Sequence, residues 1–296
     1  VARQVYERVE GPREVDFLAQ LGDLYPGSSQ PGETNTYLGP LTPDLLGESL
    51  VATVLRHRDT SPQFVEEVTR GGVENAIQQA CTVLGQLGAR HEFDPVPWIK
   101  QLLEGDFAGR VDPALKAAQS LGEETTAAPV GRVLAEVCQR SGSVELAARL
   151  EREIPEQTVS LRELGLWVAE TLVSGLDVVS TDEHVLAKRA RLLSKLGYRQ
   201  SELGQREAAL SSAEEAVKHY QALAATRPDA LLPYLAGSLS NLGARQSELG
   251  HREAALSSAE EAVKHYRALA ATSPDVFLPY LSGSLNNLGS MQGKLG

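Results

Sequence analysis

Apolar residues recur at helical spacing through the second half of the chain. Between residues 204 and 227 the apolar positions follow one another in steps of three, four and seven, while charged and hydroxyl side chains occupy the opposite positions. This spacing places one apolar stripe along an α-helix. The helix is expected to end before Pro228, because proline cannot continue it.

Another helix is predicted to follow Pro228. Asp229 is expected to cap it, Pro233 to lie in its opening turn and Gly250 to end it. The two helices are then antiparallel, and bulky side chains at their crossing would force them apart. The small residues expected at this crossing are Gly243, Ala255 and Ala262.

The pair of helices belongs to an almost exact internal repeat. Residues 197–242 recur at residues 243–288 with a step of 46 and only eight differences. A period of this length is typical of stacked helical repeats, which present an extended surface and rarely carry out catalysis. We call the helix that precedes Gly204 or Gly250 the first helix of its pair. A third helix of this kind is predicted from about residue 275 to 295. We expect the array to continue beyond this sequence, and the open edge to allow self-association or to be covered by another molecule.

The first 175 residues also have a helical pattern, without exact repetition. Pro, Ser, Asp and Gly residues mark the starts and ends of short segments. We predict a degenerate helical repeat domain over residues 41–175, leading into the regular array at 176–296. The predicted helices span residues 14–24, 43–57, 61–70, 73–88, 95–104, 112–121, 129–140, 143–153 and 158–174. Residues 25–40 are predicted to form an irregular loop.

Composition and charge exclude some partners. The chain has 296 residues and a net charge of −11. All of that charge lies in residues 1–175, and residues 176–296 balance at zero with cations interleaved among glutamates. No basic stripe indicates a nucleic-acid partner, and no apolar run reaches the ~18 residues that span a membrane. The two cysteines, Cys81 and Cys138, are predicted to be buried free thiols, which favours a cytoplasmic protein.

The chain contains none of the common catalytic or metal-binding motifs. The phosphate-binding loop, His-Glu-x-x-His and Cys-x-x-Cys are absent. We therefore predict no catalytic residue, no cofactor and no metal ligand. His219 and His265, at equivalent positions of the two copies, are expected to be half-exposed helix residues. An enzyme with a site in residues 1–175 stays as an alternative.

The repeat resembles the tetratricopeptide family. The similarity is carried by Leu242-Gly243, Leu249-Gly250, Glu253–Leu256 and Glu261–Val263. Two features depart from the family: the unit exceeds the usual ~34 residues, and Gln200 or Gln246 replaces a frequent aromatic residue. The resemblance implies an all-α fold, a right-handed superhelix of helical hairpins, with a concave face formed by the first helices.

The resemblance also implies a protein or peptide partner on the concave face. In tetratricopeptide proteins that hold a carboxylate at a peptide C-terminus, an Asn takes part at the position of Asn241. Ser194 and Tyr198 depart from that pattern, so a carboxylate clamp is not predicted. The candidate binding residues are Lys195, Tyr198, Arg199, Ser240, Asn241, Arg245, Asn286 and Asn287.

A shorter stretch resembles actinobacterial signal-transduction ATPases with numerous domains. It consists of Leu24–Pro26, Tyr37–Leu41 and Pro43–Glu48. In that family the stretch follows a winged-helix module and precedes tetratricopeptide repeats. The resemblance implies that residues 1–40 are a linker or the tail of such a module, and that the rest is a sensor arm. A stand-alone scaffold protein is the alternative.

Overall fold

The structure, a computed structural model, is all-α, as predicted. It describes residues 74–90, 93–121, 129–177 and 180–293, and these residues form eleven helices, α5 to α15, and no strand. The helices predicted at residues 14–24, 43–57 and 61–70, and the loop predicted at 25–40, lie outside the described residues.

The chain divides into two compact units. Unit 1 contains residues 1–141 and 157–161, and unit 2 contains residues 142–156 and 162–296. The predicted domain limits at residues 40 and 175 stay predictions.

Unit 1 is a bundle of helices around an aliphatic core. Trp98 is 6% exposed and serves as a core residue. Cys81 and Cys138 are free and buried, which confirms the prediction for both thiols. The described helices of unit 1 are α5 (Glu74–Arg90), α6 (Val96–Gly105), α7 (Phe107–Ser120) and α8 (Val130–Ser141).

The predicted start of α7 was wrong by about one and a half turns. Pro113 was expected to open the helix, but it lies inside it, and α7 begins at Phe107. The Asp106 side chain caps the helix by accepting a hydrogen bond from the backbone N–H of Gly109 at 3.3 Å. The cap fixes the first turn, and the proline is accommodated within the second turn.

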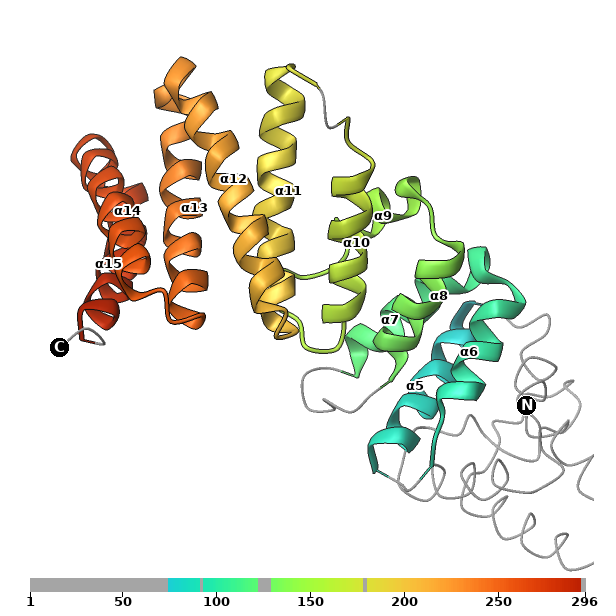
Figure 1. Cartoon of the computed structure of the whole chain (residues 1–296). Coiled ribbons are helices and arrows are strands. Elements are labelled where there is room, and N and C mark those ends of the chain that lie inside the picture. Colours follow the sequence, from blue (N-terminus) through green and yellow to red (C-terminus); the bar gives the residue numbers. More distant parts are fainter. Residues whose placement is uncertain (1–73, 91–92, 122–128, 178–179, 294–296) are drawn as a thin grey trace, which may run out of the picture. The chain divides into compact units, whose positions relative to one another are not determined.

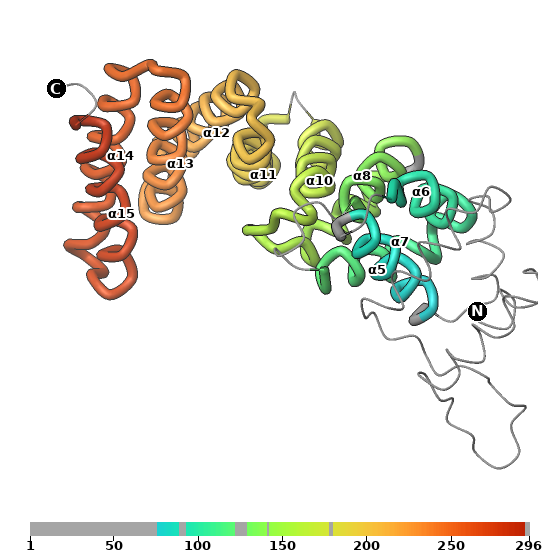
Figure 2. The backbone as a smooth tube through the Cα atoms, turned by 90° about the horizontal axis from the view of Figure 1, so that it is seen from below, coloured from blue at the N-terminus to red at the C-terminus, as the bar shows by residue number. Residues whose placement is uncertain are grey.

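Unit 2 consists of consecutive helices that pack against one another. Helices α10 to α15 stand next to one another in both views of the backbone (Figures 1 and 2). The predicted hairpins are α11 with α12 and α13 with α14. The helices of unit 2 are α9 (Val144–Leu150), α10 (Arg162–Ser174), α11 (Glu183–Glu202), α12 (Arg206–Thr226), α13 (Pro228–Glu248), α14 (Arg252–Thr272) and α15 (Pro274–Gly293).

Glycines with positive φ reverse the chain inside each hairpin. Gly204 has φ 73° and Gly250 has φ 78°, a conformation that other residues rarely adopt. The backbone N–H of His251 donates to the Gln246 carbonyl at 2.8 Å, which satisfies a carbonyl at the end of α13. The predicted end of this helix at Gly250 is confirmed.

The link between one hairpin of the repeat and the next is a single residue. Helix α12 ends at Thr226 and α13 begins at Pro228, so only Arg227 lies between them. Asp229 was expected to cap α13, but it lies in the first turn and no side chain caps the helix. Pro233 is therefore not in the opening turn as predicted; it lies inside α13, one turn further along.

Small residues allow the helices of each hairpin to approach closely. A Cβ added to Gly243 would lie 3.1 Å from the carbonyl oxygen of Ala255, and the same holds for Gly197 and Ala209. The expected role of Gly243 and Ala255 at the crossing is thus confirmed.

A hydrogen bond joins the two helices of each hairpin; it is buried in the first hairpin and partly buried in the second. The Ser212 hydroxyl donates to the Gln200 side-chain carbonyl at 2.7 Å, and Ser258 donates to Gln246 at 2.8 Å. Gln200 and Gln246 therefore each have a defined partner in the second helix.

Helix α15 packs on α14 through Met291. Met291 is 7% exposed and contacts Ala255 and Ala259, with Leu288 beside them. The helical spacing of Leu285 and Met291 predicts that both pack under a helix following α15. For Met291 this prediction was wrong, because Met291 packs on α14. Leu285 is 39% exposed.

Candidate functional site

The first helices of neighbouring repeats lie side by side and exchange polar contacts. The hydroxyls of Ser194 and Ser238 are 3.2 Å apart, which links α11 to α13. The Asn287 amide donates to the Ser240 hydroxyl at 3.4 Å, which links α13 to α15. These contacts place α11, α13 and α15 in one row within unit 2.

A shallow hollow lies where α11, α12 and α13 meet. Three predicted residues, Tyr198, Asn241 and Arg245, line it together with Ser194 and Ser238. Its space of about 300 Å³ includes the open solvent above it. The hollow combines an aromatic ring, an amide, a guanidinium group and hydroxyls, so it can hydrogen-bond to and pack against a surface laid over it.

Tyr198 is the aromatic component of the hollow. It is 40% exposed, and the guanidinium carbon of Arg199 lies 5.7 Å from its ring centroid. Burial, and then the neighbouring Glu202 carboxylate, raise the pKa of Tyr198 above its ordinary value. The phenol therefore stays protonated at neutral pH and can donate a hydrogen bond.

Arg245 contributes a cation whose charge is balanced locally. Its guanidinium group lies 3.2 Å from the Glu248 carboxylate and is 14% exposed. The Ser201 hydroxyl donates to the same carboxylate at 3.1 Å. Asn241, which is exposed, completes the α13 side of the hollow.

Lys195 forms an ion pair with an acidic residue earlier in unit 2. Its ammonium group lies 2.8 Å from Glu151, and Arg191 lies 3.0 Å from the same carboxylate. Burial alone would raise the pKa of Glu151, but the hydrogen bond from Lys195 and the charge of Arg191 outweigh it and hold this pKa below its ordinary value. Lys195 therefore attaches α11 to the segment after α9.

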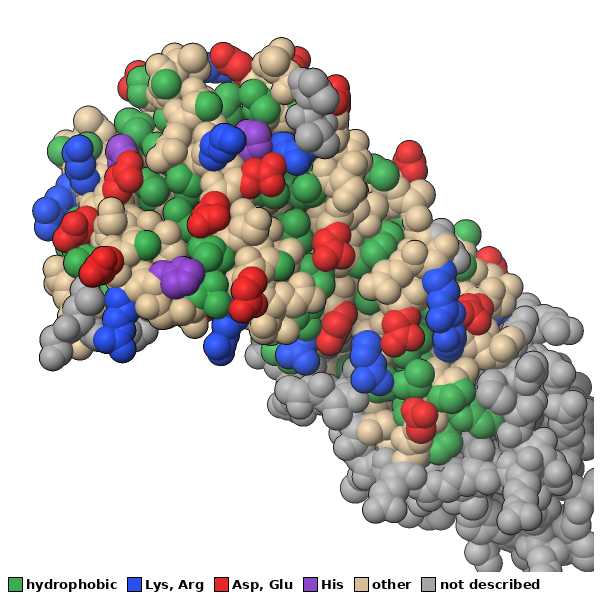
Figure 3. Space-filling model, viewed as in Figure 1, with side chains coloured by type: hydrophobic (Ala, Val, Ile, Leu, Met, Phe, Trp, Pro, Cys, Tyr) green, Lys and Arg blue, Asp and Glu red, His purple; other side chains and the backbone are tan. Residues whose placement is uncertain are grey.

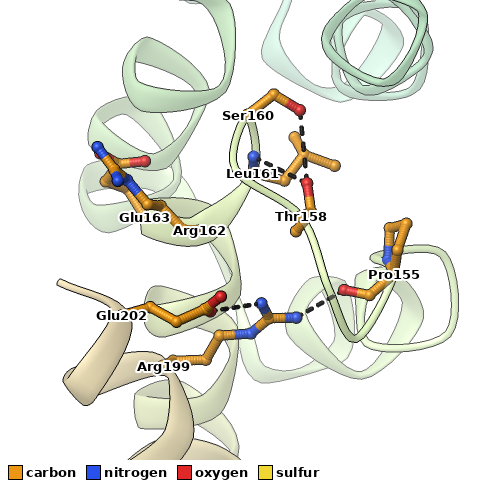
Figure 4. A network of polar contacts seen from close by, with 8 residues as sticks. All are labelled: Pro155, Thr158, Ser160, Leu161, Arg162, Glu163, Arg199 and Glu202. Carbon is orange, nitrogen blue, oxygen red and sulfur yellow. Dashed lines mark hydrogen bonds and ion pairs between the residues drawn. The ribbon is translucent and has the colours of Figure 1, made fainter. Parts of the chain in front are cut away.

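Arg199 is a buried anchor within unit 2 (Figure 4). It is 8% exposed, donates to the Pro155 carbonyl at 2.6 Å and pairs with Glu202 at 2.9 Å. A Cβ on Gly165 would lie 2.8 Å from its Nε, so this glycine on α10 makes room for the guanidinium group. The Arg199 guanidinium group also lies against the ring of the neighbouring Tyr198.

The structure divides the eight predicted residues into three groups. Tyr198, Asn241 and Arg245 meet at the hollow. Ser240 pairs with Asn287 further along, and Asn286 is exposed on α15. Lys195 pairs with Glu151, and Arg199 contacts the Pro155 carbonyl and Glu202.

Sequence reasoning missed Ser238. It occupies a position where the earlier copy has Leu192, so a polar residue stands in the apolar stripe. Ser238 is 5% exposed. That substitution was the signal that could have identified it.

The described residues offer little for covalent or metal chemistry. Nowhere in the described part of the chain do three or more His, Cys, Asp or Glu side chains gather as for a metal ion. Burial raises the pKa of Cys81 to about 12 and that of Cys138 to about 12, so neither supplies a thiolate at neutral pH. His219 and His265 are half-exposed, as expected, and lie 3.5 and 3.7 Å from Glu215 and Glu261.

Charges of both signs intermingle on the face of unit 2 shown in Figure 3. This matches the interleaving of cations and glutamates along residues 176–296. Within the described ranges, every helix is too short or too polar to cross a lipid bilayer.

Comparison with known proteins gives no further identification. No protein-family model matches the chain, and no curated protein sequence matches it.

Proposed function

We propose that unit 2 is a protein-interaction module that binds a protein or peptide partner on the surface formed by its first helices. The observation that carries the proposal is the hollow where Tyr198, Asn241 and Arg245, contributed by two successive repeats, converge. Tyrosine and arginine are the residue types that contribute most binding energy in protein interfaces. A shallow hollow suits an extended chain or a protein surface better than an enclosed small molecule.

The polar contacts around the hollow support this proposal. Arg199 and Glu202 hold Tyr198 from one side, while Glu248 orients Arg245 from the other. Side chains fixed in this way lose little conformational entropy when a partner binds. The hollow is therefore preorganised for contact.

Within a longer protein, we propose that the module serves as the sensor arm of a signalling ATPase. The support is the order of the sequence resemblances, with a short ATPase-like stretch followed by helical repeats. Partner binding would shift the population of the arm between restraining and releasing the motor. A full reading frame without a nucleotide-binding module upstream would leave a stand-alone scaffold instead. The two buried free thiols support a cytoplasmic location.

Selection from a displayed random-peptide library tests the binding surface. Peptides selected on the full chain are expected to lose about tenfold or more in affinity for Tyr198→Ala and Arg245→Ala, because each change removes a central contact. The controls Lys218→Ala and Lys264→Ala, exposed on α12 and α14, should bind normally. Equal loss with the controls, or no loss at the hollow, would contradict the proposal.

A further inference from the structure

The hollow between α11, α12 and α13 has a counterpart one repeat further along, between α13, α14 and α15. We call the hollow the first position and its counterpart the second position. Each of the eight residues that line the first position has an equivalent 46 residues later. Six of the eight are identical in the second position: the glycine, both alanines, both serines and the asparagine. The two that differ are Tyr198, replaced by Ala244, and Arg245, replaced by Met291.

Met291 fills the second position. Its Cε atom lies 3.4 Å from where an added Cβ on Gly243 would be. The side chain is 7% exposed and packs against Ala255 and Ala259 of α14. A flexible, unbranched thioether suits an irregular gap between helices. A side chain of the protein itself therefore occupies the space over the glycine.

The corresponding glycine of the first position is left open by α13. The three atoms nearest to an added Cβ on Gly197 all belong to α12. Arg245, the counterpart of Met291, instead has its guanidinium group 3.2 Å from the Glu248 carboxylate on its own helix. Gly197 thus lines the hollow, with Tyr198 beside it where the second position has only the methyl group of Ala244.

The identical polar residues are also arranged differently in the two positions. The hydroxyls of Ser194 and Ser238 are 3.2 Å apart in the first position. In the second position Ser240 instead accepts a hydrogen bond from Asn287 at 3.4 Å. Ser284, the counterpart of Ser238, is 3% exposed and its hydroxyl has no partner within the protein. The replaced residues therefore change the second position as a whole.

We propose that the partner binds at the first position and not at the second, so that it has one register on two almost identical repeats. This inference rests on the function proposed above. Specificity between the two positions is a difference of affinities. Tyr198 and Arg245 raise the affinity of the first position through their contacts, and Met291 lowers that of the second by occupying its space. These three residues determine the register.

The stoichiometry of the unaltered chain gives the first test. A short peptide, selected on the full chain from the displayed library, is titrated by calorimetry. One peptide per chain is expected. Hydrogen exchange should slow in α11 and α12 on binding, and α14 and α15 should exchange as before.

A gain of binding gives the second test. The triple variant Ala244→Tyr, Met291→Arg and Lys294→Glu supplies the second position with the ring, the guanidinium group and the carboxylate that corresponds to Glu248. It should bind two peptides per chain, with the two dissociation constants within about tenfold of each other. Met291→Leu is the matched control: it keeps an apolar side chain of similar volume over Gly243, so it should still bind one peptide. Circular dichroism checks that the variants keep their helices.

The outcomes separate this inference from the proposed function. Two peptides bound by the unaltered chain would overturn the inference alone, and this measurement decides even where the triple variant does not fold. One peptide bound by a folded triple variant would also overturn it. Normal binding by Tyr198→Ala and by Arg245→Ala would instead overturn the proposed function, and the inference with it.

Discussion

At the residue scale, two equivalent glycines have different surroundings. Gly243 lies at the crossing of α13 and α14, whereas Gly289 on α15 has open space around it. Glycine weakens a helix interior by itself, so its replacement by alanine is favourable only where there is room for the methyl group.

We expect Gly289→Ala to stabilise the chain by up to about 1 kcal/mol through helix propensity. Gly243→Ala should instead destabilise it by about 1–3 kcal/mol, because the methyl group is forced against a backbone carbonyl. Urea unfolding followed by circular dichroism measures both. Equal effects would show that the hairpin crossing is looser than described.

The Gln200–Ser212 hydrogen bond gives a second prediction at this scale. Ser212→Ala should cost about 1–3 kcal/mol, because it leaves the buried glutamine carbonyl without its partner. The double change Gln200→Leu with Ser212→Ala should cost less than Ser212→Ala alone. A double-mutant cycle by urea unfolding measures the coupling, and strictly additive effects would contradict it.

At the scale of elements, the 46-residue period located the long helices well. The apolar stripe along each helix and the glycines at the turns are local signals, so they predicted the bounds of α12 and α14. The start of α7 was missed because Asp106 competes with Pro113 as an opening signal, and only the cap contact decides between them. At α13 the proline was likewise given too much weight as a start.

The candidate site was predictable only in part. The repeat step brings Tyr198, Asn241 and Arg245 onto one face, so their meeting could be expected. The burial of Arg199 could not be expected, because its partner is the backbone carbonyl of Pro155, which lies in an irregular segment. No spacing rule relates that segment to α11.

Pro233 provides a test at the scale of the helix. It lies inside α13, where it removes a backbone hydrogen bond, so Pro233→Ala should stabilise the chain by about 1 kcal/mol. Pro228→Ala is the matched control, since the first helical position has no bond to lose. Thermal unfolding compares the two variants. A loss of stability with Pro233→Ala would mean that its ring contributes more by packing than it costs.

At the scale of the whole molecule, α12 and α14 are nearly identical in sequence. They differ at one position, where α12 has Gln221 and α14 has Arg267. Each contacts its first helix through a glycine and a glutamine at equivalent positions. Stability in such arrays is a sum of units and their interfaces.

Deletion of residues 205–250 should therefore leave a folded, shorter array. Joining Gly204 to His251 places α14 on α11 in the position of α12. The helical signal per residue should persist while the urea midpoint falls. Deletion of residues 228–250 is the control, because it leaves two second helices in succession and should abolish cooperative unfolding. Similar behaviour of the two deletions would contradict the exchange.

The near-identity of α12 and α14 also has a consequence during folding. A chain emerging from denaturant can join α11 to either helix, and the wrong choice loops out one complete unit at a modest entropic cost. Such a product contains correct local contacts, so it must reopen before it can reach the native order. The precision of the duplication thus makes this chain prone to kinetic traps, in which a helix finds the right kind of neighbour in the wrong copy.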